Sequence, residues 1–190
     1  TTLIPIGVRT TEALLGARDR IFGCAGSDVV FGGSGGDHID GGTDAGHDVV
    51  VGDNGNATFD SSGVLTLVQS SDAAVAAPGH WNYDDVIAVG KGVNIVLGGN
   101  GGDTITGGTD SDVVIGDNGR ASFDSVAGES ILTTITTIDP TFGDNDVINV
   151  GAGTNTVIGG LGTDYINVDQ TTLLPLGTGE GDDVILGDNG

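Results

Sequence analysis

Short apolar bursts recur every nine residues along this chain of 190 residues, and each burst is followed by glycines. Twelve nine-residue steps align, and in all twelve the fourth position holds a β-branched residue. Branched side chains favour strands, whereas glycine accepts the positive φ angles of tight turns. The pattern therefore predicts three-residue strands separated by glycine turns. The fourth-position residues are Ile21, Val30, Ile39, Val50, Ile87, Val96, Ile105, Val114, Ile148, Val157, Ile166 and Ile185.

The steps are grouped into larger repeats. GDNGNATFD at 52–60 returns as GDNGRASFD at 116–124, and GDNG occurs again at 187–190. A single step cannot bury its own apolar face, but stacked steps share a continuous core of Val and Ile. We therefore predict an all-β fold, a parallel β-solenoid built from three modules of four steps each.

We expect one continuous solenoid domain with insertions. The segment 10–20, TTEALLGARDR, is the one stretch whose composition predicts a helix, with Thr11 as its N-cap, and this helix would shield the first step. The predicted parts are an N-terminal cap or linker at 1–18, repeat modules at 19–60, 84–124 and 144–190, and inserted hairpins with loops at 61–83 and 125–143.

Outward positions of the strands differ between odd and even steps. Positions three and five of the even steps are mostly apolar, as at Phe31, Leu97 and Ile115, whereas those of the odd steps are mixed. An exposed apolar face of that size would be a binding or aggregation site. The inserted hairpins are expected to cover it, and a protein partner or a second copy is the competing occupant. The hairpin packing residues predicted are Leu65, Leu67, Ile131, Ile135 and Leu174.

The second position of the steps is acidic. It holds Asp in ten steps and Asn in two, within a chain that has 27 acidic and 5 basic side chains and a net charge of −22. Such a charge argues against a nucleic-acid partner. Turn preference explains scattered Asp but not one fixed phase. Because Ca²⁺ prefers carboxylate and carbonyl oxygens, stacked acidic corners next to glycine turns predict cation sites. The column is Asp19, Asp28, Asp37, Asp48, Asp85, Asn94, Asp103, Asp112, Asp146, Asn155, Asp164 and Asp183.

The step x-D-x-U-x-G-G-x-G, where U is apolar, is a circular permutation of GGxGxDxUx. It thus resembles the calcium-binding nonapeptide of the RTX (repeats-in-toxin) family, and FGGSGGDHI at 31–39 and LGGNGGDTI at 97–105 match that motif. The resemblance implies a right-handed parallel β-roll with two nonapeptides per turn and several Ca²⁺ ions between loops stacked on one edge. It implies side-chain ligands at Asp28, Asp37, Asp48, Asp103, Asp112, Asp164 and Asp183, and carbonyl ligands at Gly33, Gly35, Gly99 and Gly101.

Some positions depart from the family pattern. Asn94 and Asn155 stand in the ligand column, which predicts weaker sites or none. The GDNG loops place Asp53, Asp117 and Asp188 where the motif has glycine. Each of these three is either an added ligand or an Asx turn, and both interpretations stay open at this point.

No catalytic motif is recognisable, so the chain is not expected to be an enzyme. His38, His47 and His80 lack metal or catalytic spacing, and one cysteine, Cys24, permits no intrachain disulfide. No apolar run is long enough to span a membrane.

The predicted function is a calcium-dependent structural segment of a secreted or cell-surface bacterial protein, which folds on meeting extracellular Ca²⁺. Resemblance to the family implies type I secretion and flanking RTX domains. One alternative is a carbohydrate-binding accessory module of a secreted polysaccharide-active enzyme, in which Trp81 and Tyr83 would stack on sugar. The other is a self-associating filament or adhesin stalk.

Overall fold

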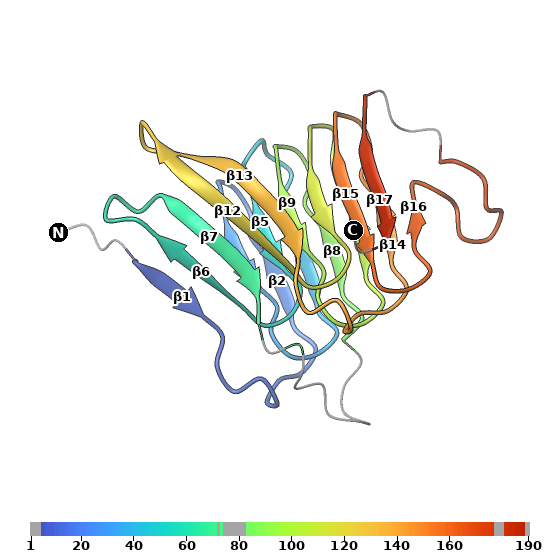
Figure 1. Cartoon of the computed structure of the whole chain (residues 1–190), viewed down its shortest axis with the longest axis horizontal. Helices are drawn as coiled ribbons and strands as arrows, with labels where there is room; N and C mark the ends of the chain where they lie inside the picture. The colour runs from blue at the N-terminus through green and yellow to red at the C-terminus, as the bar shows by residue number, and fades with distance from the viewer. Residues whose placement is uncertain (1–4, 72, 74–82, 177–180, 189–190) are drawn as a thin grey trace.

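The computed structural model describes residues 5–71, 73, 83–176 and 181–188, and this part of the chain is all-β with almost no helix. Its strands form two parallel six-stranded sheets and one antiparallel five-stranded sheet (Figure 1). Successive short strands alternate between the two parallel sheets, which is consistent with a β-roll. In the described part, no helix has the length and apolar character needed to cross a bilayer.

We name the sheets by the steps that supply them. The odd sheet contains β2 (Arg20–Phe22), β4 (His38–Asp40), β8 (Val86–Ala88), β10 (Thr104–Thr106), β14 (Val147–Asn149) and β16 (Tyr165–Ile166). The even sheet contains β3 (Val29–Phe31), β5 (Val49–Val51), β9 (Ile95–Leu97), β11 (Val113–Ile115), β15 (Thr156–Gly160) and β17 (Val184–Asp188). The hairpin sheet contains β1 (Gly7–Arg9), β6 (Gly55–Phe59), β7 (Leu65–Ser70), β12 (Gly119–Val126) and β13 (Glu129–Thr137).

The fourth-position residues stack in register. Ile39 pairs with Ile87, and Val50 pairs with Val96, although the first inserted hairpin separates these strands in sequence. The insertions therefore leave the stack without shifting it. The side chains of this column form the core between the odd and even sheets, and most are fully buried. Ile185 is 47% exposed because β17 is the last strand of its sheet.

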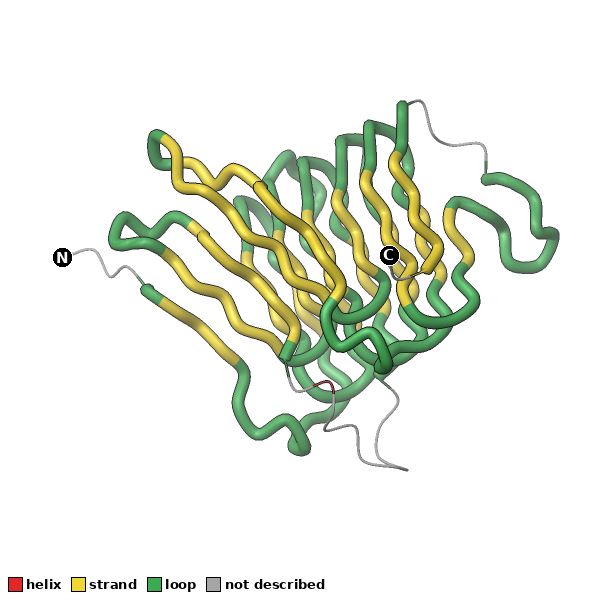
Figure 2. The backbone as a smooth tube through the Cα atoms, in the orientation of Figure 1, coloured by secondary structure: helices red, strands yellow, loops and turns green. Residues whose placement is uncertain are grey.

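The inserted segments form the two predicted hairpins, β6 with β7 and β12 with β13, and these lie together in one sheet (Figure 2). They begin at Gly55 and Gly119, earlier in the chain than the predicted insertions at 61–83 and 125–143. The hairpin sheet packs on the outer face of the even sheet through a second apolar core. Leu97 and Ile115 have no exposed surface, so the expectation that the hairpins cover this face is confirmed for the central strands, whereas Val184 and Leu186 of β17 stay exposed.

The predicted packing residues of the hairpins are only partly right. Leu65 and Ile135 belong to the second core, whereas Leu67 does not, and Ile131 and Leu174 are 47% and 63% exposed. Two β-bulges explain the errors in the hairpins, because each shifts the alternation of inward and outward side chains. Leu174 lies beyond the hairpins, in the loop after β16. The missed packing residues are Ala57, Val68, Ala121, Phe123 and Leu132.

The helix predicted at 10–20 is wrong. This segment has no helical residue, and Glu12 adopts a φ of 63°, which an α-helix does not allow. Its polar groups bond to other parts of the chain: the Ser34 hydroxyl donates to the carbonyl of Ala13 at 2.6 Å, and Arg18 Nε donates to the carbonyl of Gly36 at 3.0 Å. The segment therefore lies as an extended cover over the loop at Ser34.

Candidate metal centre

We call an odd strand together with the even strand that follows it one turn. The loops that join these strands form two kinds of corner, and each kind lies along one edge of the two parallel sheets. We call the corners that lead from an even strand to the next odd strand the first edge, and the corners that lead from an odd to an even strand the second edge. At both edges the backbone N–H of each second-position residue, except the last, donates to Oδ1 of the second-position residue in the next turn. These bonds make two continuous polar ladders along the stack.

The ladders have the following members. The first-edge ladder runs through Asp19, Asp37, Asp85, Asp103, Asp146 and Asp164, with N···Oδ1 distances from 2.6 to 3.1 Å. The second-edge ladder runs through Asp28, Asp48, Asn94, Asp112, Asn155 and Asp183, with distances from 2.8 to 3.0 Å.

Many of the carboxylates have one oxygen that finds no donor in the protein. Seven buried carboxylate oxygens in the described part of the chain lack a hydrogen-bond partner, and six of the seven lie on the first edge. A buried acceptor without a donor is costly, and a carboxylate more so, because it loses its hydration. A cation bound along this row of oxygens would replace the lost hydration and neutralise their charge. The seven are Oδ2 of Asp28, Asp37, Asp85, Asp103 and Asp146, and Oδ1 of Asp53 and Asp117.

Glycine at the sixth position makes room for these oxygens. The point where a Cβ of Gly116 would lie is 1.9 Å from Oδ2 of Asp146 and 2.5 Å from the carbonyl oxygen of Gly159. At Gly98 the corresponding oxygens are Oδ2 of Asp103 at 2.4 Å and the carbonyl of Gly116 at 1.8 Å. Carboxylate and carbonyl oxygens thus meet beside a residue without a side chain, which is the hard-oxygen donor set that Ca²⁺ prefers.

Burial also changes the pKa values of the first-edge carboxylates. Burial raises the pKa of Asp85 and of Asp146 to about 8, and that of Asp117 to about 7. Burial also raises the pKa of Asp53 and of Asp103 well above the usual value, and neighbouring carboxylates add to the effect. Burial thus opposes the charged form of these carboxylates, and a bound divalent ion would favour that form and displace protons from them.

The predicted carbonyl ligands lie in two loops of the first edge. Gly33 and Gly35 come before Asp37, and Gly99 and Gly101 come before Asp103. All four glycines have positive φ, between 96° and 132°. At Gly99 a Cβ would also lie 2.5 Å from Oδ2 of Asp53, so glycine is required there for space as well as for conformation.

The aspartates of the GDNG loops connect successive turns. Oδ2 of Asp53 accepts from the backbone N–H of Asn100 at 2.6 Å, and Oδ2 of Asp117 accepts from the N–H of Leu161. Their Oδ1 atoms are buried without a partner. Asp188, at the end of the stack, is exposed.

The Asx-turn interpretation of Asp53 and Asp117 is not supported by these bonds. An Asx turn would use the N–H two residues further on. The N–H of Gly55 instead donates to the Thr10 hydroxyl at 3.1 Å, and the N–H of Gly119 donates to the Ser70 hydroxyl at 3.2 Å.

The structure sorts the predicted aspartates by edge. Asp85 and Asp146 were missed as ligand candidates because the inserted hairpins separate them from a complete GGxGxD motif, although their place in the second-position column marked them. In the described residues no three His, Cys, Asp or Glu side chains converge on one point, so any site there depends on backbone carbonyls. The first edge holds Asp37, Asp53, Asp103, Asp117, Asp164 and Asp188, and the second edge holds Asp28, Asp48, Asp112 and Asp183.

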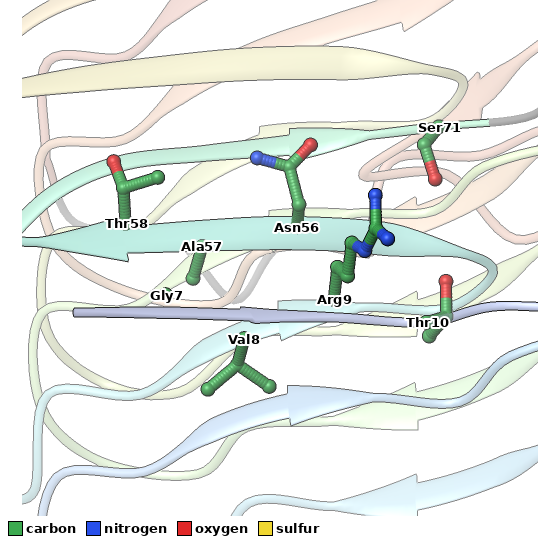
Figure 3. A pocket seen from close by; sticks show the side chains of 8 residues that line it. All are labelled: Gly7, Val8, Arg9, Thr10, Asn56, Ala57, Thr58 and Ser71. Atoms are coloured by element: carbon green, nitrogen blue, oxygen red, sulfur yellow. The ribbon is translucent and has the colours of Figure 1, made fainter. Parts of the chain in front are cut away.

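The other candidate groups that the structure describes do not cluster into a metal site. His38 is on the outer face of β4, and Nδ1 of His47 accepts from the N–H of Val93 at 3.0 Å. His80 and Trp81 lie outside the described residues, and Cys24 is an exposed free thiol. A cavity of about 570 Å³ beside β1 and β6 is lined by Arg9 but by no carboxylate (Figure 3).

Comparisons with known proteins agree with the residue pattern. The family model described as the RTX calcium-binding nonapeptide repeat (four copies) matches residues 16–45, 89–120 and 141–170. No curated protein and no solved structure matches the chain. The matched segments contain Asp28, Asp37, Asp103, Asp112 and Asp164. These three segments of the chain are therefore repeats of the RTX calcium-binding nonapeptide family.

Proposed function

We propose that this chain is a structural segment of a secreted or cell-surface bacterial protein and that it closes into a right-handed β-roll when it binds extracellular Ca²⁺. The proposal gives the roll three modules of four steps. The observation that carries it is the row of six buried, unpartnered carboxylate oxygens along the first edge. The family itself is a calcium-binding structural repeat, which agrees with a role in architecture rather than in catalysis.

The residues that would hold calcium are the ladder aspartates and the glycine carbonyls beside them. When bound, Ca²⁺ supplies positive charge and accepts oxygen ligands from two adjacent turns. Oδ1 of Asp146 fixes the spacing of two turns by accepting from the N–H of Asp103, while its Oδ2 faces the corner glycine. Asp53 and Asp117 are proposed as added ligands, because each has one oxygen on the next loop and one without a protein partner.

Binding and folding are coupled in this proposal. The chain carries a net charge of −22, and the structure stacks its carboxylates in adjacent turns, so the metal-free chain opposes its own compaction. Extracellular calcium modules typically have Kd values of about 10⁻⁴ to 10⁻³ M. The chain would therefore stay open at cytosolic calcium levels, suited to export, and would condense outside the cell, since binding energy becomes folding energy.

Calcium stoichiometry tests this function. The chain is dialysed against millimolar calcium, and bound metal is counted by native mass spectrometry and elemental analysis, with magnesium at the same concentration as the comparison. Several calcium ions per chain and weak magnesium binding are expected, because the corners offer many oxygens in flexible geometry. A chain that binds no calcium under these conditions overturns the proposal.

The two other functions have no supporting observation. The sugar-binding alternative depends on Trp81 and Tyr83, of which Trp81 lies outside the described residues and Tyr83 is half-buried. The filament alternative depended on an uncovered even sheet, and the hairpins cover most of that face.

A further inference from the structure

The two edges of the molecule are satisfied in different ways. Of the seven unpartnered carboxylate oxygens in the described residues, only that of Asp28 lies on the second edge. Further along this edge the ladder contains Asn94 and Asn155, and neither has any exposed surface. The second edge therefore has buried amides at two positions where a calcium site would need a carboxylate.

The amide of Asn94 is bonded at both ends. Its Oδ1 accepts from the N–H of Asp48 at 2.9 Å, the same ladder bond that the aspartates of this edge accept after the first one. Its Nδ2 donates to the carbonyl of Gly92 and to Oδ1 of Asp112, both at 3.0 Å. A glycine carbonyl and a carboxylate of the next turn are the oxygen types that a corner cation would contact. Here one NH₂ group contacts both.

Asn155 repeats this arrangement in the third module. Its Oδ1 accepts from the N–H of Asp112 at 2.8 Å, and its Nδ2 donates to the carbonyl of Gly153 at 3.3 Å and to Oδ1 of Asp183 at 3.1 Å. Two loops far apart in sequence thus use the same set of contacts. Because the same contacts occur twice, they are a repeated structural feature of the second edge.

Each of these asparagines follows a loop that lacks the sixth-position glycine. Val89 precedes Asn94 and Val150 precedes Asn155, and both valines are fully buried in the core between the parallel sheets. At the corners that keep glycine, a Cβ would lie only 2.5 Å from Oδ2 of Asp48, or 2.6 Å from Oδ2 of Asp112. A valine therefore takes the space that a second carboxylate oxygen needs.

We infer that the Val89–Asn94 and Val150–Asn155 pairs make metal-free corners, in which the asparagine amide takes the place of calcium. This inference rests on the proposed calcium-binding function and refines it. The ion row then runs mainly along the first edge, while at these two corners the second edge is joined by hydrogen bonds that need no metal. These corners can pair adjacent turns before calcium arrives.

Restoring the motif tests the inference. Val89→Gly with Asn94→Asp changes VGKGVN to GGKGVD, a complete GGxGxD sequence, and Val150→Gly with Asn155→Asp does the same in the third module. Each double variant is expected to bind one more calcium ion per chain than the wild type, counted by native mass spectrometry. Asn94→Asp alone is the matched control and is expected to gain none, because Val89 still fills the space.

The outcomes separate the two proposals. A wild type without bound calcium defeats the proposed function, whereas a calcium-binding wild type whose folded double variants gain no ion overturns the inference alone. A gain by Asn94→Asp as large as that of the double variant also overturns it. If the double variants do not fold, calcium anomalous scattering from wild-type crystals decides: the inference requires no ion at Asn94 or Asn155, and an ion at either refutes it.

Discussion

The backbone N–H of Asp103 donates a 2.8 Å hydrogen bond to Oδ1 of Asp146, which leaves Oδ2 of Asp146 buried without a protein partner. The second hairpin lies between these residues in sequence, yet their bond is the same as that between Asp85 and Asp103, which are 18 residues apart. The ladder thus fixes the stacking of turns regardless of insertions. It also orients one oxygen of each carboxylate toward the corner, where a cation is needed.

Removing the charge of Asp146 separates the effects of calcium and of burial. Asp146→Asn keeps an Oδ1 that accepts from Asp103, but it loses the charged oxygen at the corner. We expect calcium affinity to fall, since a charged ligand is lost, and the strand content of the chelated chain at pH 8 to rise, since a buried charge is removed. Calorimetric titration measures the first effect, and circular dichroism in excess chelator measures the second.

The control for that variant is Asp124→Asn, on the exposed face of β12. This variant removes one charge at a position far from the corners. Its calcium affinity and its strand content in chelator should equal those of the wild type within error. If Asp146→Asn has no more effect than this control, the first-edge oxygens do not bind calcium.

A substitution at a sixth-position glycine tests whether the corners need room for carboxylate oxygens. In Gly116→Ala the new methyl group would lie 1.9 Å from Oδ2 of Asp146, so either the carboxylate or the strand must shift. We expect at least one calcium ion to be lost and the midpoint of the calcium-dependent folding transition to move to higher calcium. Gly187→Ala is the matched variant, because it has the same place in the step and its Cβ would meet no described residue within 4 Å. Equal effects of the two substitutions would contradict the steric argument.

The metal-free chain should be stabilised by acid. Burial raises the pKa of Asp85 and of Asp146 to about 8 from 3.8, so the folded state binds protons more tightly than the unfolded state. The stability that this protonation provides is complete below about pH 4 and is lost as the pH rises toward 8. In chelator we expect the strand spectrum, which is absent at pH 8, to return progressively as the pH is lowered from 8 to 5. No gain of strand content over this range would show that the carboxylates are not buried as described.

The cover formed by the hairpins should contribute measurably to stability. Ile115 is fully buried between the even sheet and the hairpin sheet, and Ile115→Ala is expected to cost about 2–5 kcal/mol of unfolding free energy in saturating calcium. Ile131→Ala, on the same hairpin layer but 47% exposed, should cost less than about 1 kcal/mol. Comparable losses at the two sites would mean that the hairpins do not pack on the even sheet in solution.

The repeats made the stack predictable, because each constraint appears many times. The column that contains Ile87 and Val96 defined the strands and the core, and the apolar outward residues such as Leu97 correctly required a cover. The helix at 10–20 could not be tested in this way, since it occurs once. The conformation of this segment depends on long-range contacts such as the hydrogen bond between Ser34 and Ala13, which only the folded chain reveals.

The sequence predicted which type of residue would form the candidate site, but it did not predict how the unpartnered oxygens divide between the two edges. The motif identified Asp37 and Asp103, yet it overlooked Asp85 and Asp146, whose motifs the hairpins interrupt. The β-bulges, which turn Leu132 inward in place of Ile131, also leave no mark in the hydrophobic pattern. Asn94 and Asn155 marked two weaker corners in the sequence. The position of each second carboxylate oxygen, which completes the asymmetry between the edges, is visible only in the folded chain.

Circular dichroism during calcium titration and chelation tests the central claim most directly. At pH 8 we predict a strand spectrum in millimolar calcium, its loss in excess chelator, and its full return when calcium is restored, with magnesium unable to replace calcium. A chain that keeps the same spectrum and the same melting temperature in excess chelator would contradict the account.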